Sequence, residues 1–529
     1  MRAAFTVRTL IPVLERSVCR LCPGRRVIPV GGGACAHVYN QEMAFRPGVL
    51  VPSMRGPSVA LLGAICLPLV AFVQVPADSL AQAAGASGQG PLTLQQAIAT
   101  ASANYPAIKA SQAQQQAAQG AIAVAKTAYL PHSDILWQTN RATANNILGL
   151  LLPQAVIPSV TGTVLPADTT RSAWNSAGGA LVNWQPFDFG ARGAKVEYAQ
   201  HGDEAAKQAS LLTQLQVSAN AGSAFFDLAA AEQLVTVAKA NVERLEAFDK
   251  AVHVLIDNTL RPAADASQAD AQLALARNQL IQIETQVAVK RAALSAYLQT
   301  KPGQAEIDPS ALLQSLPAMD LVVARAASHP FVLEEHALTL QQKAQARFLD
   351  RTYVPVFSTS GVVFGRGAGT NTSGSFPGGT AGLAPDTLNW GVGVQVSFSA
   401  FEFFNLRDQK RVQEANVRAE QARFDQAISD VNTALEQAQA TLAGARKLAA
   451  NTPIELTAAQ ASEKQQQARY RSGLATVVDV AAAEGVLAQA EGDDAIARLG
   501  VWRAELGVAV AQGDLQPFLQ LLESQAKGK

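Results

Sequence analysis

Cysteine is scarce in this chain of 529 residues. The four cysteines are Cys19, Cys22, Cys35 and Cys66, and none follows position 66. The rest of the chain therefore has no disulfide and no thiolate metal or redox site. Cys19 and Cys22 form one isolated pair in a basic segment, which is a weak signal for a metal site.

Other deficits exclude further classes of function. Formal charge is zero, with 42 Lys and Arg against 42 Asp and Glu, so a nucleic-acid role has no electrostatic support. Beyond Val73 there is no apolar run of about 18 residues, the length that a transmembrane helix needs. The sequence after this point has no P-loop, GxSxG or HExxH motif. We therefore expect no enzyme activity, no catalytic residue, no cofactor and no metal.

The beginning of the chain has the pattern of a leader. The apolar run at 59–73 follows a basic residue and precedes small residues that resemble signal-peptidase sites. We expect a secretory signal within 1–83, cleaved near position 78 or 84. Because a signal rarely lies so far inside a chain, true initiation is expected at Met54 or Met43, and an unusually long leader is the alternative.

The remainder contains a long internal repeat. Tyr-Leu-Pro at 129–131 returns as Tyr-Val-Pro at 353–355, and Pro106 returns as Pro330 with the same offset. A repeat of this length exceeds the unit of a solenoid and indicates two related halves. The halves are expected at 91–300 and 319–513, with a linker at 301–318 and a tail at 514–529.

Each half has the composition and periodicity of long helices. Aromatics make up only 6% of the chain, while Ala and Gln are abundant, which suits narrowly packed helices. In each half, two shorter helices together match the length of one helix of about 67 residues, so they can stack along it as a coiled coil. Helices are expected at 92–102, 107–128, 191–257, 263–300, 321–328, 331–350, 405–472 and 477–512, with a kink at Pro453.

Four further segments alternate apolar and polar residues with the period of a strand. The clearest has Val392, Val394 and Val396 on one face. Four strands cannot close a barrel across a bilayer, where open strand edges are forbidden, so several chains have to share one barrel. Strands are expected at about 132–142, 173–187, 353–365 and 389–401.

Several stretches combine into a family pattern. The most specific is Arg-Tyr-Arg-Ser-Gly-Leu-Ala-Thr-Val-Val-Asp-Val at 469–480. Leu-Thr-Leu-Gln-Gln-Ala-Ile at 92–98, Asn-Tyr-Pro at 104–106 and Pro-Phe-Asp-Phe-Gly at 186–190 support it. Over 91–512 the chain resembles the TolC-like outer membrane factors, the trimeric exit ducts of Gram-negative efflux and secretion systems.

The resemblance implies a mixed α and β membrane protein. Its fold is expected to be a trimeric 12-stranded β-barrel, with four strands per chain, continued by a long α-helical coiled-coil tunnel in the periplasm. Its expected function is the outer membrane channel of a tripartite efflux or type I secretion system. This homotrimer would sit in outer membrane lipid and dock a periplasmic adaptor and an inner-membrane pump of RND or ABC type. The sequence does not decide between drugs, metals and proteins as the cargo. The pump encoded by the neighbouring genes would distinguish these alternatives. The alternative is a non-transporting coiled-coil envelope spacer or adhesin.

In this family the turns between helices form a periplasmic gate and an adaptor-docking tip. Gly473 can take a positive φ and end the long helix. In the first half, Asn258 or Thr259 occupies the position that corresponds to Gly473. Asn258 is the preferred equivalent, because Asn tolerates the left-handed conformation. The candidate residues of the tip are Asn258, Asp265, Tyr470, Arg471, Gly473 and Asp479.

Two interpretations stay open for most of these residues. Asp265 and Asp479 lie at the starts of helices, where they are either caps or a ring of carboxylates at the gate. Tyr470 either packs within a coiled coil or, with Arg471, ties neighbouring helices shut. Ala475 stands where some family members carry a gate charge.

Other prominent side chains have ordinary explanations. Trp137, Trp174 and Trp390 are either aromatics of a membrane interface or simple strand packing. His329 and His336 lie seven residues apart without further ligands in metal-site spacing. For both histidines we expect structural or surface roles.

Overall fold

The computed structural model describes residues 90–527, except 144, 146–149, 153, 159–169, 259–261, 302 and 318–325. The expected leader at 1–83 lies outside the described residues. In chain order the elements are α1 (Leu94–Asn104), α2 (Pro106–Thr127), β1 (His132–Thr143), β2 (Ser172–Phe187), α3 (Ala191–Asp257), α4 (Ala263–Leu298), α5 (Ser310–Gln314), η3 (Ala326–Ser328), α6 (Pro330–Asp350), β3 (Val356–Ala368), β4 (Thr387–Ser397), η4 (Ala400–Glu402), α7 (Phe403–Arg471), α8 (Val477–Gln512) and α9 (Gln516–Lys527).

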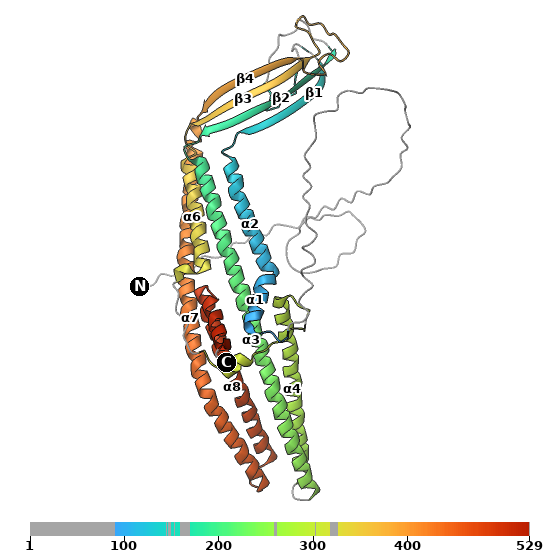
Figure 1. Ribbon diagram of the computed structural model, residues 1–529, viewed down its shortest axis with the longest axis vertical. Coiled ribbons are helices and arrows are strands. Elements are labelled where there is room, and N and C mark those ends of the chain that lie inside the picture. The colour runs from blue at the N-terminus through green and yellow to red at the C-terminus, as the bar shows by residue number, and fades with distance from the viewer. Residues whose placement is uncertain are drawn as a thin grey trace, which may run out of the picture. The chain divides into compact units, whose positions relative to one another are not determined.

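The two long helices, α3 and α7, each have two shorter helices packed along them. α2 and α4 accompany successive parts of α3, and α6 and α8 accompany α7 in the same way (Figure 1). This is the stacking expected from the helix lengths. α3 also packs against α6 and α8, which joins the two halves of the chain.

Most helices begin and end near their expected positions, because their apolar periodicity is long. α3 and α8 have the expected bounds. Pro453 stands inside α7, and the kink expected there stays a prediction. Of the helix expected at 321–328, only the last three residues are described, and they form η3. None of the described helices is long and apolar enough to cross a membrane.

The segments expected as linker and tail contain α5 and α9, which complete a core with α8. Trp502 of α8 is fully buried, and its indole N–H donates to the carbonyls of Leu312 at 3.1 Å and Ser315 at 3.0 Å. Its ring lies 6.5 Å from that of Phe518 in α9. With five residues, α5 is too short to have a detectable helical period, so the sequence did not indicate it.

The four described strands form one antiparallel sheet in the order β1-β2-β3-β4, with β1 and β4 at its edges. The register aligns Ile135, Ala180, Val363 and Trp390 across the sheet, and aligned residues point to the same face. Ile135 is 88% exposed and Trp390 is 76% exposed. One face of the sheet is therefore apolar and uncovered in the single chain.

Leu136, which interrupts the alternation of β1, points to the opposite face. There it packs against a cluster of Ala177, Phe364 and Ile157. Ile157 belongs to the connection between β1 and β2, so part of this connection covers the second face. Apolar residues on both faces explain the imperfect alternation of β1.

β3 and β4 are shifted from their expected positions. β3 begins three residues later than expected, because Pro355 has no N–H to donate to a strand ladder. The first residue of β3, Val356, pairs with Ser397. β4 therefore ends at Ser397, opposite the first residue of β3. The expected end at position 401 has no partner residue in β3.

Candidate functional site: the paired helix turns

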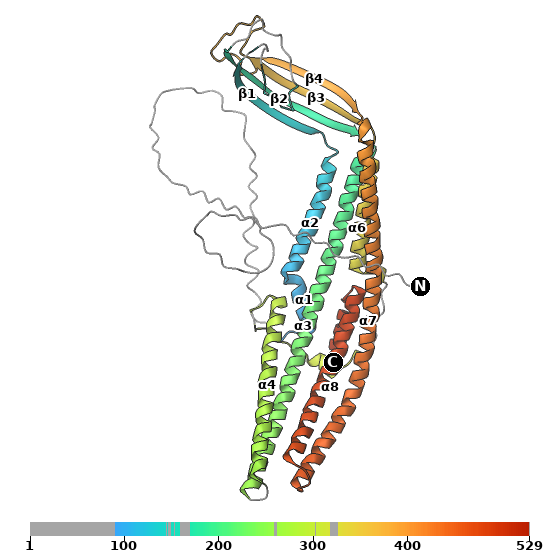
Figure 2. The ribbon, with the colours of Figure 1, turned by 180° about the vertical axis from the view of Figure 1, so that it is seen from behind.

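The C-terminal end of α3 and the N-terminal end of α4 lie beside the α7–α8 turn, at the end of the bundle opposite the sheet (Figure 2). In the α7–α8 turn, Gly473 has a φ of 76°, which glycine adopts without strain. Its N–H donates to the carbonyl of Tyr470 at 3.0 Å, and the N–H of Leu474 donates to that of Arg469 at 2.8 Å. These two hydrogen bonds form a Schellman motif, so Gly473 ends the long helix as expected.

The start of α8 is capped reciprocally by Thr476 and Asp479. The N–H of Thr476 donates to the Asp479 carboxylate at 2.8 Å, and the N–H of Asp479 donates to the Thr476 hydroxyl at 3.3 Å. The hydrogen bonds from the backbone and then the side chain of Thr476 hold the pKa of Asp479 below its ordinary value. Asp479 is thus an exposed, charged cap, and its role in a gate stays a prediction.

The α3–α4 turn differs from the α7–α8 turn. Asn258 has a φ of −88°, so the left-handed conformation expected there is wrong. Its side-chain amide donates to the carbonyl of Val254 at 2.7 Å, which satisfies the helix end without a positive φ. The alternative, Thr259, lies outside the described residues. Asp265 lies in the first turn of α4, as expected.

Tyr470 packs between the ends of the two helix pairs within one chain. It is 3% exposed and packs with Val252 of α3 and Val477 of α8. Its ring lies edge-on to that of Phe248, with the centroids 5.1 Å apart. Of the two roles expected for Tyr470, the structure shows packing within the coiled coil. Arg471 is exposed, and its contact with a neighbouring chain stays a prediction.

An ionic clamp above the turns was not predicted. Arg244 of α3 lies 2.9 Å from a carboxylate oxygen of Glu484, which is fully buried in α8. The same guanidinium donates to both oxygens of Glu491, at 3.2 and 3.0 Å. Gln467 of α7 donates to the second oxygen of Glu484 at 3.0 Å. The clamp therefore joins α3, α7 and α8.

Glu463 of α7 adds a second buried carboxyl group to this clamp. Burial, and then the neighbouring Glu484, raise the pKa of Glu463 above its ordinary value of 4.5. A raised pKa means that its contribution to stability is complete below the ordinary value and is lost as the pH rises through the folded-state value. The contribution of Glu463 to the stability of this clamp is therefore expected to be more favourable in mild acid than at neutral pH.

A Glu463→Gln variant tests this dependence. Glutamine resembles the protonated carboxyl group, so the variant should melt at a higher temperature than the wild type at neutral pH. Between pH 4.5, the ordinary pKa of a glutamate, and neutral pH, the melting temperature of the variant should also change less than that of the wild type. Thermal melts over this pH range measure the effect, with Glu455→Gln on the exposed side of α7 as control. Equal pH slopes for Glu463→Gln and wild type would contradict the assignment.

The two histidines considered in the sequence have structural roles. His329 is buried, and burial lowers its pKa. Its Nδ1 accepts from the N–H of Phe331 at 3.2 Å, and its Nε2 lies 3.3 Å from the Val510 carbonyl. The His336 ring packs against Phe424, with the centroids 5.3 Å apart.

Residues 97–299 and 325–514 match a family model described as outer membrane efflux protein. The match covers well over half of the chain, so this protein belongs to the outer membrane efflux protein family. The mixed α and β fold class expected from the sequence is thereby confirmed.

Solved structures of outer membrane channels share this fold. The Campylobacter jejuni CmeC outer membrane channel is 14% identical with a TM-score of 0.66, over 79% of this chain and 85% of that one. The outer membrane protein VceC from Vibrio cholerae is 16% identical with a TM-score of 0.64, over 80% and 96% of the two chains. The open state of the Neisseria gonorrhoeae MtrE outer membrane channel is 16% identical with a TM-score of 0.64, over 80% and 89%. No curated protein sequence matches this chain.

Proposed function

We propose that three copies of this chain form a 12-stranded β-barrel in the outer membrane, continued by a helical tunnel into the periplasm. The observation that carries this proposal is the uncovered apolar face of the sheet. Val392 and Val394 of β4 are each 77% exposed, and Trp137 of β1 is 66% exposed. Such a face is favourable against lipid and unfavourable against water.

The sheet edges explain why copies have to associate. In lipid, the outward N–H and C=O groups of β1 and β4 need partners. Pairing β4 of one copy with β1 of the next lets three copies close a ring. The described strands have between 11 and 16 residues, which is enough to cross a bilayer.

Cysteine cross-linking in intact membranes tests the barrel, because the chain has no cysteine after position 66. A cysteine replaces Asp134 in β1, and a second is moved stepwise along β4. We expect disulfide-linked dimers and trimers at one register, together with a trimer that migrates differently after heating. Monomers in every combination would contradict the barrel and would favour the spacer or adhesin.

The proposed activity is that of a passive exit duct in a tripartite efflux or type I secretion system. A periplasmic adaptor docks at the helix turns, and an inner-membrane RND or ABC pump supplies the energy. Membership of the outer membrane efflux protein family supports this activity. The geometry of the turn supports the docking position, because a Cβ added to Gly473 would meet no atom within 4 Å. A partner can therefore approach the backbone there.

Asp265 and Asp479 are proposed to line the periplasmic opening with carboxylates. Six carboxylates from three chains would attract cations and repel anions. The double variant Asp265→Ala/Asp479→Ala should therefore lower cation selectivity, measured from reversal potentials in planar bilayers. A Thr476→Ala variant, which removes a cap but no charge, is the control. Unchanged selectivity in the double variant would leave both carboxylates as helix caps only.

A further inference from the structure

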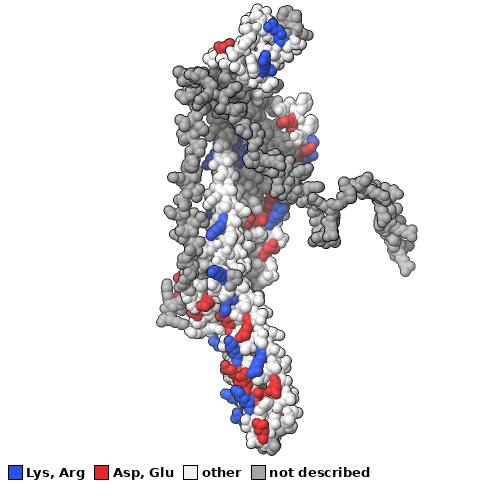
Figure 3. All heavy atoms as spheres, turned by 90° about the vertical axis from the view of Figure 1, so that its right-hand side faces the viewer, with Lys and Arg blue, Asp and Glu red and all other residues white. Residues whose placement is uncertain are grey.

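A ladder of ion pairs with heptad spacing joins α3 and α4. Its members are seven residues apart on each helix, as expected for pairs that flank the seam of a coiled coil. Figure 3 shows side chains of both charges gathered over the lower part of the helices. The pairs are Glu232–Arg291 at 2.8 Å, Lys239–Glu284 at 3.7 Å, Glu246–Arg277 at 2.6 Å and His253–Asp270 at 3.7 Å.

The pair nearest the α3–α4 turn differs from the others. It contains the imidazole of His253 in place of a permanent cation. Four residues earlier, on the same face of α3, stands Asp249. The equivalent positions in the three preceding heptads are Leu228, Val235 and Val242. A carboxylate thus occupies a seam position that is apolar elsewhere in this coiled coil.

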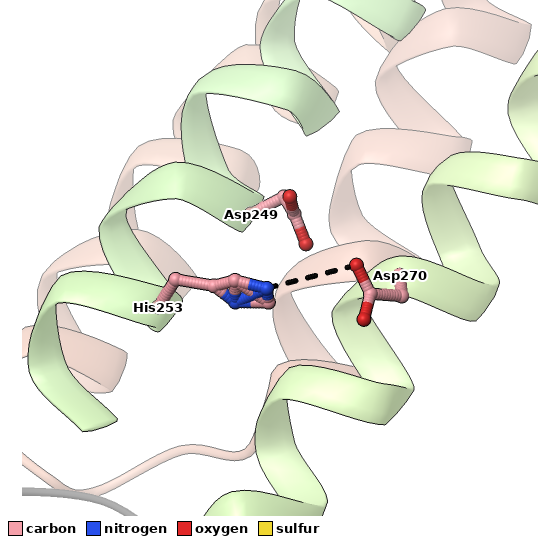
Figure 4. A group of neighbouring side chains, drawn as sticks. All are labelled: Asp249, His253 and Asp270. Atoms are coloured by element: carbon pink, nitrogen blue, oxygen red, sulfur yellow. Dashed lines mark ion pairs between the residues drawn. The ribbon is translucent and has the colours of Figure 1, made fainter. Parts of the chain in front are cut away.

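The three side chains converge on one space. Figure 4 shows Asp249 and His253 on one helix and Asp270 on the other, pointing toward one another. One potential ligand atom from each lies within 4.8 Å of the others. Oδ1 of Asp249 is buried and accepts no hydrogen bond within the described part of the chain. A buried acceptor without a partner is destabilising, and a bound cation would satisfy it.

We propose that Asp249, His253 and Asp270 bind a divalent transition-metal ion of the zinc class, which links α3 to α4 beside the tip. One imidazole nitrogen and two carboxylate oxygens are ligands that Zn²⁺ takes in proteins. Ca²⁺ and Mg²⁺ prefer oxygen ligands alone, so the imidazole selects against them. The Asp270 side chain is 61% exposed, which leaves room for a water ligand.

The sequence predicted no metal at this place, because His253 and Asp270 have no ligand spacing typical of a motif. Only the register of α4 on α3 brings them together. The proposal does not depend on transport, since the site lies within one chain.

Zinc binding to the metal-free trimer, purified without the leader at 1–83 and its four cysteines, tests the proposal. The protein is purified in detergent without a histidine tag, and Zn²⁺ is titrated in competition with a chromophoric chelator. We expect one site per chain, weakened by more than about tenfold in His253→Gln, Asp249→Asn and Asp270→Asn. Cu²⁺ bound in the same place should show coupling to one nitrogen by electron paramagnetic resonance, and His253→Gln should lose it. Excess Ca²⁺ should not displace Zn²⁺.

Two variants separate a built site from a surface histidine. His201 also lies 3.7 Å from a carboxylate, that of Glu197, but Glu197 is bound by Arg347 at 2.7 Å. His201→Gln should therefore leave zinc binding unchanged. Asp249→Val restores the apolar seam, so it should raise the melting temperature of the metal-free protein and abolish the increase caused by zinc. Wild-type affinity in Asp249→Asn and Asp249→Val, or equal losses in His201→Gln and His253→Gln, would overturn the proposal.

Discussion

Replacing Arg244 by Met is expected to lower the free energy of unfolding by about 3–5 kcal/mol, the usual cost of removing one partner from a buried ion pair. The Glu484 side chain has no exposed surface, and the Arg244 guanidinium lies 2.9 Å from its carboxylate. Methionine preserves most of the aliphatic length of arginine but leaves the carboxylate of Glu484 without its cation. The loss therefore comes from an uncompensated buried charge more than from lost packing.

Chemical unfolding of the purified protein measures this loss. Lys239→Met on the same helix is the control, because Lys239 and Glu284 are both about half exposed and 3.7 Å apart. Water screens such a pair, so its loss should cost at most about 1 kcal/mol. The double variant Arg244→Met/Glu484→Gln removes both charges and should recover much of the stability. Equal losses for Arg244→Met and Lys239→Met would mean that the clamp contributes no more than a surface pair.

The clamp shows why part of the site was not predictable. Arg244 and Glu484 are 240 residues apart in the sequence, and nothing local to either indicates the other. A charged residue on an amphipathic helix is by default assigned to the solvated face. Asp249 was missed for the same reason, since its seam position is visible only once α4 is aligned on α3.

Features whose cause is local were predictable. The α7–α8 turn is determined by Gly473, Thr476 and Asp479, which lie within seven residues of one another, and the expected helix end and helix start are present. The bounds of α3 followed from a long apolar period. Asn258 was assigned the wrong backbone conformation because an Asn can close a helix either by left-handed φ or by its side-chain amide, and its identity does not decide between them.

Replacing Gly473 by Trp is expected to abolish efflux while the trimer still assembles. A φ of 76° is strained for residues other than glycine, at a cost of about 1–3 kcal/mol, which a large bundle can tolerate. Because a Cβ at this position meets no atom within 4 Å, the tryptophan side chain would start into open space beside the turn. It would occupy the surface on which the adaptor is proposed to dock.

Complementation of a deletion strain measures the effect, using compounds to which the deletion sensitises the cells and checking trimer on unheated gels. Gly473→Asn is one control, since Asn tolerates a positive φ and is small, and it should retain efflux. Gly444→Trp is the second control, because Gly444 also has open space around it but lies in the middle of α7. Normal efflux with Gly473→Trp would remove this turn from the docking surface. Loss of the trimer in both Gly473→Trp and Gly473→Asn would show that Gly473 acts in folding. In that case even Asn, which tolerates a positive φ and adds little bulk, could not replace glycine.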